Sequence, residues 1–404
     1  MIYRFSCLLL LTPNRHCAKT LLSYIERVWN NVQKDPLFDI PAPICVRLIE
    51  ASLAACRFAS LSLKRKIVSH IESVRDLQLP DHLQLAVAYQ KSVLLRWKGE
   101  HFESDKIIRG VLGKVNVNVE DTRVHCAYGL LQLSRTENAI MREEFDIAKS
   151  YLASWEIQNR PGFEVQDQTP SGLELHVVRL KTTVHGRLAR YSRDFKLAHH
   201  LLEKCLNIIP GNTARCHIIH HLADVLCELN EPEQAENLVQ QEAHFKSNSP
   251  TRSFRRLVLP LAEAYIMQKK IEDARSILEG LQLFYKGAIS LDVSDQVGHV
   301  RSTIGLARIY SYEGKWLKSR EALEDALRLT EEYSTFKKDG FYTGIIQLFL
   351  ASVHFQLKDD HRALRSFTLA QDIRIKEQVQ HFIPGLGTYV LASIESEVVQ
   401  TLSG

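Results

Sequence analysis

Apolar and small residues recur along the chain with the spacing of paired helices. The clearest example is Thr303–Ala326. Its residues Leu306, Ala307 and Tyr310 share one helical face. A turn at Gly314 follows, and a second apolar helical face lies beyond it. The stretch therefore predicts two antiparallel helices joined by a short turn.

The same pattern recurs as a small residue followed by another small residue twelve positions later. This spacing places one small side chain on each arm of an antiparallel helix pair at its closest approach. The two helices can then pack near the short end of the usual separation of about 8–10 Å. The pairs are Ser92/Ser104, Gly186/Ala198, Ala223/Ala235, Ala262/Ala274, Ala307/Ser319 and Ala351/Ala363, with Thr136/Ala148 as a poorer seventh.

These residues resemble the tetratricopeptide repeat (TPR), and the resemblance covers roughly residues 82–375. The first small residues lie 44, 50, 37, 39, 45 and 44 positions apart. The simple repeat has a period of about 34, so the chain is similar to the long-repeat type. The resemblance implies an all-α, right-handed α-solenoid of about seven or eight antiparallel helix pairs. The best-matching unit is Leu306-Ala307, Tyr310, Gly314, Trp316, Ser319, Leu323 and Ala326.

The repeats divide the chain into three expected parts. Residues 1–81 form N-terminal helices that match the repeat poorly or cap it, 82–378 form the repeat array, and 379–404 form a C-terminal capping helix. Within the first part, Thr20–Val32 is an amphipathic helix, and Ile44–Phe58 and Leu61–Val74 form one more pair. The weak early repeats favour a missing N-terminal domain or a partner at that end.

Phe5–Thr12 is a short apolar run near the N-terminus. We expect a buried first helix or the cut edge of a longer protein there, with a signal segment as the alternative. The run is too short to span a bilayer, and we expect no membrane association.

Composition is ordinary for a folded protein, with 45% apolar and 24% charged residues. The formal charge of +4 is too small to imply nucleic-acid binding by itself. Eight scattered cysteines without a CxxC pair indicate reduced thiols. They predict a cytoplasmic protein, with the nucleus as an alternative.

The chain lacks the sequence patterns of a P-loop, a GxSxG elbow, an HExxH zinc site and an EF-hand. We therefore expect no enzyme, no catalytic residue and no cofactor. The run from Cys216 to His221 holds His217 and His221 at a spacing that can bind zinc. No second cluster completes such a site, so structural roles are preferred and no metal is expected.

The resemblance implies that the first helix of each pair lines a concave, ligand-binding side. Counting from each small residue gives the expected partner-binding positions, in which arginine and aromatic residues predominate. Arginine binds carboxylates through two parallel hydrogen bonds and stacks on rings, which suits an acidic protein or peptide segment. The alternative is that these arginines solvate the groove and pair with nearby glutamates. The positions are Arg96, Trp97, Arg187, Arg190, Tyr191, His217, His220, Arg256, Arg301, Arg308 and Tyr312.

The sequence thus favours a non-enzymatic protein–protein interaction scaffold or adaptor that binds a partner segment. The alternative is a detached sensor array of a STAND-type signalling ATPase or a transcription regulator. The oligomeric state and the pathway stay open.

Overall fold

All regular structure in the described part of the chain is helical. The computed structural model describes residues 15–34, 41–56, 59–74, 77–117, 120–156, 172–208, 212–242 and 251–376, with Ser396 and Val399. The predicted features at Phe5–Thr12 and 379–404 lie outside these residues, apart from Ser396 and Val399. The helices are α2 (Arg15–Lys34), α3 (Ala42–Cys56), α4 (Leu61–Ser73), α5 (Asp81–Trp97), α6 (His101–Leu112), α7 (Thr122–Met141), α8 (Phe145–Ala153), α9 (Gly172–Tyr191), α10 (Phe195–Ile208), α11 (Asn212–Glu228), α12 (Pro232–Gln240), α14 (Arg252–Met267), α15 (Ile271–Gly287), α16 (Val293–Tyr312), α17 (Trp316–Glu332), α18 (Phe341–Gln356) and α19 (Asp360–Lys376).

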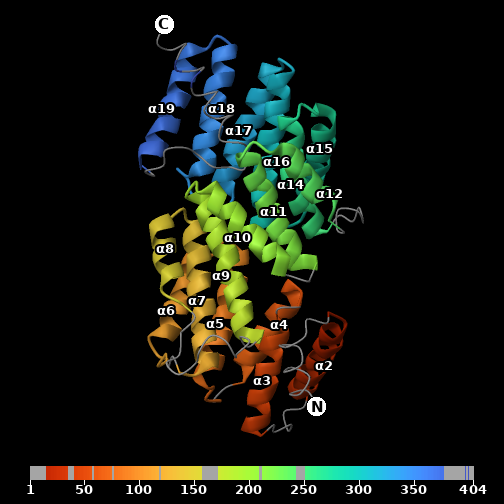
Figure 1. The fold of residues 1–404 in the computed structure, drawn as a ribbon, viewed down its shortest axis with the longest axis vertical. Helices are drawn as coiled ribbons and strands as arrows, with labels where there is room; N and C mark the ends of the chain where they lie inside the picture. The colour runs from red at the N-terminus through yellow and green to blue at the C-terminus, as the bar shows by residue number, and fades with distance from the viewer. Residues whose placement is uncertain are drawn as a thin grey trace. The chain divides into compact units, whose positions relative to one another are not determined.

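After α2, the helices form consecutive pairs, which confirms the predicted class (Figure 1). We call α3, α5, α7, α9, α11, α14, α16 and α18 the first helices, and the helix that follows each one its second helix. The predicted small residues lie where the two helices of a pair meet, and all of them are buried. In two pairs the contact is a hydrogen bond. The Ser104 hydroxyl donates to the Ser92 carbonyl at 3.1 Å, and the Ser319 hydroxyl donates to the Ala307 carbonyl at 2.9 Å.

The turns between paired helices share one backbone conformation. In seven of the described turns, a residue with positive φ lies seven positions after the first small residue. In six of these, its N–H and the next N–H bond back to carbonyls of the first helix, as in Gly314 to Ser311 and Lys315 to Tyr310. This is a Schellman turn, which closes a helix through a left-handed residue. The left-handed residues are Gly99 and Gly314, with the non-glycines Glu143, Arg193, Asn230, Lys269 and Lys358.

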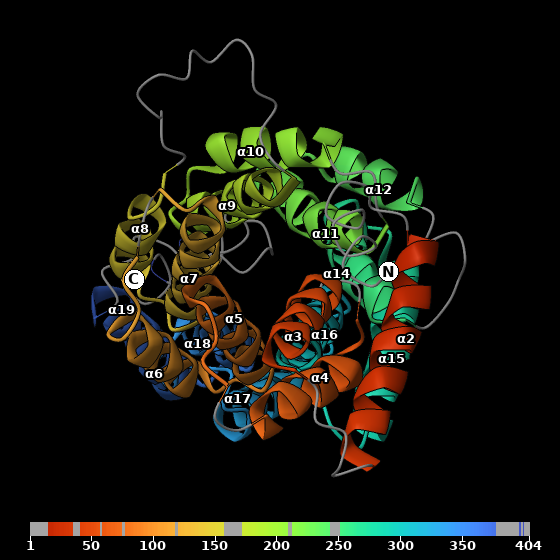
Figure 2. The same cartoon turned by 90° about the horizontal axis from the view of Figure 1, so that it is seen from below.

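The chain divides into two compact units. Unit 1 comprises Met1–Ile140 and Asp146–Lys181, and unit 2 comprises Met141–Phe145 and Thr182–Gly404. The predicted part boundaries after residues 81 and 378 stay predictions. Within unit 2, the first helices lie on the inner side of the array and the second helices on its outer side (Figure 2).

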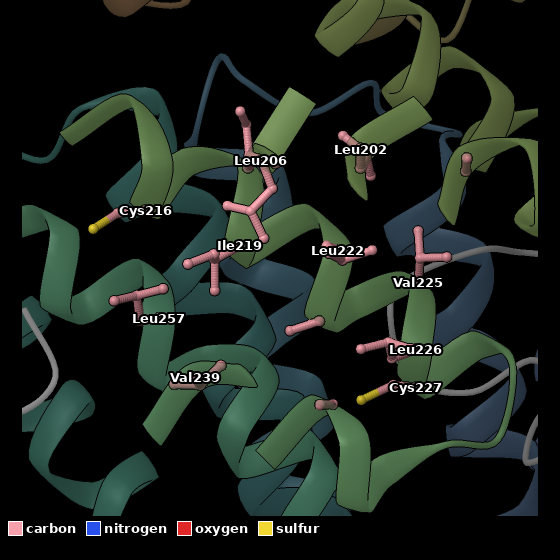
Figure 3. Close-up of a cluster of buried hydrophobic side chains, with 14 of the residues drawn as sticks. Leu202, Leu206, Cys216, Ile219, Leu222, Val225, Leu226, Cys227, Val239 and Leu257 are labelled. Carbon is pink, nitrogen blue, oxygen red and sulfur yellow. The ribbon is translucent and has the colours of Figure 1, made fainter. Parts of the chain in front are cut away.

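The core of unit 2 is built where each pair packs on the next. Leu202 from α10 and Val239 from α12 are both fully buried in one cluster with residues of the first helices α11 and α14. Ile219 of α11 lies next to Leu257 of α14 in the same cluster, to which Leu222 also belongs (Figure 3). Each pair therefore buries its apolar face against its neighbours, as expected of a repeat array.

None of the described helices combines the length and the apolar character that crossing a bilayer requires.

The shared turn geometry gives a stability prediction. Lys269 has φ of 59°, a conformation that costs an L-residue about 1–2 kcal/mol. We expect Lys269→Gly to raise the thermal unfolding midpoint and Gly314→Ala, at φ of 69°, to lower it. Gly280→Ala is the control, because it lies within α15 and an added Cβ meets nothing within 4 Å. It should stabilise the helix by about 1 kcal/mol. Equal effects of Gly314→Ala and Gly280→Ala on the unfolding midpoint would contradict a left-handed turn at Gly314.

Candidate partner-binding site

Of the expected partner-binding residues, Arg96 and Trp97 lie in unit 1, at the end of α5. The Arg96 guanidinium pairs with Glu137 of α7 at 2.6 Å and donates to the Ser134 hydroxyl at 2.6 Å. The Lys64 ammonium lies 5.6 Å from the centre of the Trp97 ring. The charge of Arg96 is thus balanced within unit 1.

The remaining nine expected residues lie in unit 2, where Asp224 of α11 is the centre of a buried ion-pair network. The Asp224 carboxylate is fully buried and contacts Arg190 of α9 at 3.0 Å. It also accepts two hydrogen bonds from Arg301 of α16, at 2.8 and 3.1 Å. One carboxylate therefore joins first helices from three helix pairs.

Charge attraction overcomes the cost of burying these groups. Burial would raise the pKa of Asp224, but Arg301 and Arg190 lower it to about 2. Burial would likewise lower the pKa values of Arg190 and Arg301, but Asp224 raises both. All three groups are therefore ionised at neutral pH.

A second buried pair joins α14 to α16. The Arg308 guanidinium donates to Glu263 at 2.6 Å, and both side chains are almost fully buried. The guanidinium carbon of Arg308 lies 5.9 Å from the centre of the Phe349 ring. The expected residues Arg190, Arg301 and Arg308 are thus ion-paired inside unit 2. The partner of Arg308 is a glutamate, as in the alternative interpretation of the sequence, and that of Arg190 and Arg301 is an aspartate.

Three histidines of α11 lie beside this network. Nδ1 of His220 is 2.8 Å from the Arg256 backbone carbonyl of α14. Burial lowers the pKa of His220 to about 4, against the attraction of Asp224. Burial also lowers the pKa values of His217 and His221 well below the ordinary value, with a further contribution from Arg187. These imidazoles are therefore neutral at pH 7.

Arg256 has a different kind of partner from the two other arginines of α14. Arg252 pairs with Asp292 at 3.0 Å and Arg255 pairs with Asp295 at 2.9 Å, both at the start of α16. Arg256 instead donates its Nε hydrogen to the neutral Ser294 hydroxyl at 2.8 Å. Within the part of the chain that the structure describes, no carboxylate lies within ion-pairing distance of the Arg256 guanidinium.

The remaining expected residues differ in access. Arg187 is 8% exposed, whereas Tyr312, at the end of α16, is 59% exposed. Tyr191 stacks on Phe145 with ring centres 5.7 Å apart, and Phe145 stacks in turn on Phe341 at 5.4 Å. Tyr191 is thus packed by aromatic neighbours.

The histidine cluster includes one group with metal-ligating atoms. Ligand atoms of His220, His221 and Asp224 lie within 4.8 Å of one another. However, Arg190 and Arg301 already bind the Asp224 carboxylate. A divalent cation there would displace or face two guanidinium groups, so the donor set does not fit a metal.

The residues expected from the sequence all lie on first helices, but sequence reasoning missed the acidic groups that pair with the arginines of α14. Asp292 and Asp295 were not singled out, although an aspartate before a helical stretch is a recognisable N-cap. Asp292 accepts hydrogen bonds from the Ser294 and Asp295 backbone N–H groups at 2.9 and 3.1 Å. This cap fixes the start of α16 opposite the arginines of α14.

No protein-family model matches the chain, and no curated protein matches its sequence. Solved structures do match. A Rap protein complexed with Competence and Sporulation Factor is similar with a TM-score of 0.55 and 11% identity, over 80% of this chain and 87% of that chain. NprR in complex with its cognate peptide NprX is similar with a TM-score of 0.54 and 15% identity, over 77% of this chain and 83% of that chain.

The fold is that of a TPR-like helical repeat. A STAND protein with a tetratricopeptide-repeat sensor, from Pyrococcus horikoshii, is also similar, at a TM-score of 0.45 and 13% identity. That similarity covers 95% of this chain and 55% of that chain, and its score is too low to support an argument. At these identities the similarities establish the TPR-like fold and nothing of the activity.

The buried network predicts a large effect of removing the charge of Asp224. Asp224→Asn deprives the buried Arg190 and Arg301 of the carboxylate that both contact, and breaking a buried ion pair costs about 3–5 kcal/mol. We expect a clear fall in the thermal unfolding midpoint. The control is Glu272→Gln, whose pair with Arg275 has an 83% exposed glutamate. It should change stability by less than about 0.5 kcal/mol. Similar effects of both changes would contradict a network role for Asp224.

The depressed histidine pKa values predict a loss of stability in weak acid. Between the unfolded pKa of about 6.5 and the folded pKa of His220 of about 4, the unfolded chain binds a proton that the folded chain does not. Protonation therefore favours unfolding, and stability falls as the pH drops through this window. His220→Asn retains a donor for the Arg256 carbonyl and should reduce the fall in unfolding midpoint between pH 7 and 5. An unchanged fall would show that His220 does not cause it.

Proposed function

We propose that the chain is a non-enzymatic interaction scaffold that binds a protein or peptide segment along the first helices of unit 2. One observation carries the proposal. The first helices α9, α11 and α14 bring together arginines and neutral histidines, of which Arg256 has a neutral hydroxyl as its partner instead of a carboxylate. These groups offer hydrogen-bond donors and positive charge to a partner.

The similar structures support the class of partner. The Rap protein was solved with Competence and Sporulation Factor, and NprR with its cognate peptide NprX. By analogy of fold, we propose a peptide or an extended protein segment as the ligand of this chain. An acidic segment suits the arginines best, because carboxylates bind guanidinium groups through charge-assisted hydrogen bonds.

The proposal contains no chemical step. The most deeply buried carboxylates on the first helices are already bound by arginine, Asp224 by two and Glu263 by one. Asp224 is a poor general base, because Arg301 and Arg190 hold its pKa far below neutral. A sensor array within a longer signalling protein stays the alternative function.

Buried ion pairs restrict which variants can test binding. Charge reversal at Arg190 or Arg308 would place two like charges together in the interior and would unfold the protein before it tested any ligand. The test must therefore locate the ligand without changing these residues.

Selection from a random peptide library, followed by hydrogen–deuterium exchange with a selected peptide, would locate the binding face. We expect selected sequences with net negative charge and slowed exchange in α9, α11, α14 and α16. The second helices α10, α12 and α15 serve as the internal control and should change little. Protection confined to those second helices, or selection of basic peptides, would contradict the proposal.

A further inference from the structure

The charge of Arg256 is only weakly stabilised in the free protein, because its side chain is partly buried and its hydrogen-bond partner is a neutral hydroxyl. Three arginines of α14 meet only two carboxylates of α16, and Arg256 is the one left with a hydroxyl partner. Burial, followed by the positive charge of Arg252, lowers the pKa of Arg256 to about 10, despite attraction from Asp292 and Asp295. An added negative charge at this guanidinium would therefore be stabilising.

His217 and His221 add hydrogen-bonding capacity near Arg256. The His220 ring, whose Nδ1 lies 2.8 Å from the Arg256 carbonyl, contacts the His221 ring with centres 4.9 Å apart. Burial, followed by the positive charges of Arg256 and Arg187, lowers the pKa of His217. His221 is 7% exposed, and neither of its ring nitrogens has a hydrogen-bond partner among the residues that the structure describes. The His217 and His221 rings contact each other edge to face, with centres 4.7 Å apart. Buried polar atoms without partners cost free energy, which a ligand with acceptor oxygens can recover.

We propose that Arg256, His217, His221 and Arg187 form an anchoring subsite for one oxyanion of the partner, either a carboxylate or a phosphate. A guanidinium binds either group through two parallel hydrogen bonds, and a neutral imidazole donates one more from its N–H. The subsite would contribute to the proposed binding function, and this inference rests on that function. It gives the bound segment a fixed point between α11 and α14.

The same histidines are better suited to an anion than to a metal ion. Arg187, Arg252 and Arg256 all act on His217, and each would repel a cation. The carboxylate that could offset this repulsion, Asp224, is held by Arg190 and Arg301. Among the residues that the structure describes, no carboxylate lies within ion-pairing distance of the Arg256 guanidinium, so this group would attract an oxyanion.

Direct titration of the full chain would test the subsite with three probes. Inorganic phosphate represents the phosphate source, end-blocked hexaglutamate represents the carboxylate source, and hexaglutamine is the uncharged control. We expect one anionic probe to bind and hexaglutamine not to bind. Binding should weaken as sodium chloride is added, because salt screens the attraction. The probe that binds more tightly shows whether the partner's oxyanion is a phosphate or a carboxylate.

Two arginine variants give a matched comparison. Arg256→Gln removes one charge and keeps a donor for Ser294. Arg362→Gln on α19 also removes one charge, from an arginine that is 59% exposed. We expect the first change to weaken binding by about tenfold or more and the second by less than about twofold. Arg256→Lys should restore part of the affinity, because it restores the charge without the planar fork.

A structural role for Arg256 would give a different result. Without ligand, Arg256→Gln should unfold at the same temperature as the parent chain or higher, because it removes repulsion from Arg252 and Arg187. A lower unfolding temperature combined with unchanged affinity would overturn the proposal. Tight Zn²⁺ binding without any anion binding would overturn it as well, and would assign His220, His221 and Asp224 to a metal.

The failure of this inference can be told apart from failure of the proposed function. If library peptides protect the first helices but bind equally well to Arg256→Gln, the subsite is wrong and the scaffold function stands. If an anionic probe requires Arg256 but no peptide is selected from the library, the subsite stands and the peptide-binding function is wrong.

Discussion

The close crossing of two helices at a pair of small residues is the constraint on which the rest of the structure depends. Side chains at these crossings are fully or almost fully buried, and in two pairs a serine hydroxyl bonds directly to the facing backbone. Twelve residues separate the two small positions, so the chain must reverse between them. The left-handed turn residue accordingly falls at one fixed offset in every described repeat with such a crossing. Crossing, turn and apolar face therefore form a single local unit.

Features that lie within one helix pair could be predicted from the sequence, because all the residues that form them are close together in the chain. The small pairs, the turn at Gly314 and the pairing of helices depend on residues within about one hairpin, and the spacing of residues predicted each of them. Contacts between repeats depend on loops whose lengths vary, since the first small residues lie 37 to 50 positions apart. Asp224 and Arg301 meet across 77 residues, and no fixed offset leads from one to the other.

One contact between repeats nevertheless recurs in both units. Arg96 and Arg190 each lie four residues after the first small residue of their repeat, and each pairs with the acidic residue that follows the small residue of the next repeat. These partners are Glu137 and Asp224. Such pairs offset their own desolvation cost and add little net stability, but a shifted repeat would leave both charges buried and unpaired. Their effect is to fix how one repeat docks on the next.

The same use of charge separates the arginines of the first helices that pair with internal carboxylates from Arg256, whose partner is a hydroxyl. The sequence placed Arg256, Arg301 and Arg308 on the first helices, but it could not say which of them meets an internal carboxylate. Arg301 and Arg308 do, at Asp224 and Glu263. The two aspartates at the start of α16, Asp292 and Asp295, pair with Arg252 and Arg255 and not with Arg256. In the proposed subsite, the charge of Arg256 would attract an acidic segment and repel a basic one. We therefore propose that the docking which orders the repeats also favours an acidic partner.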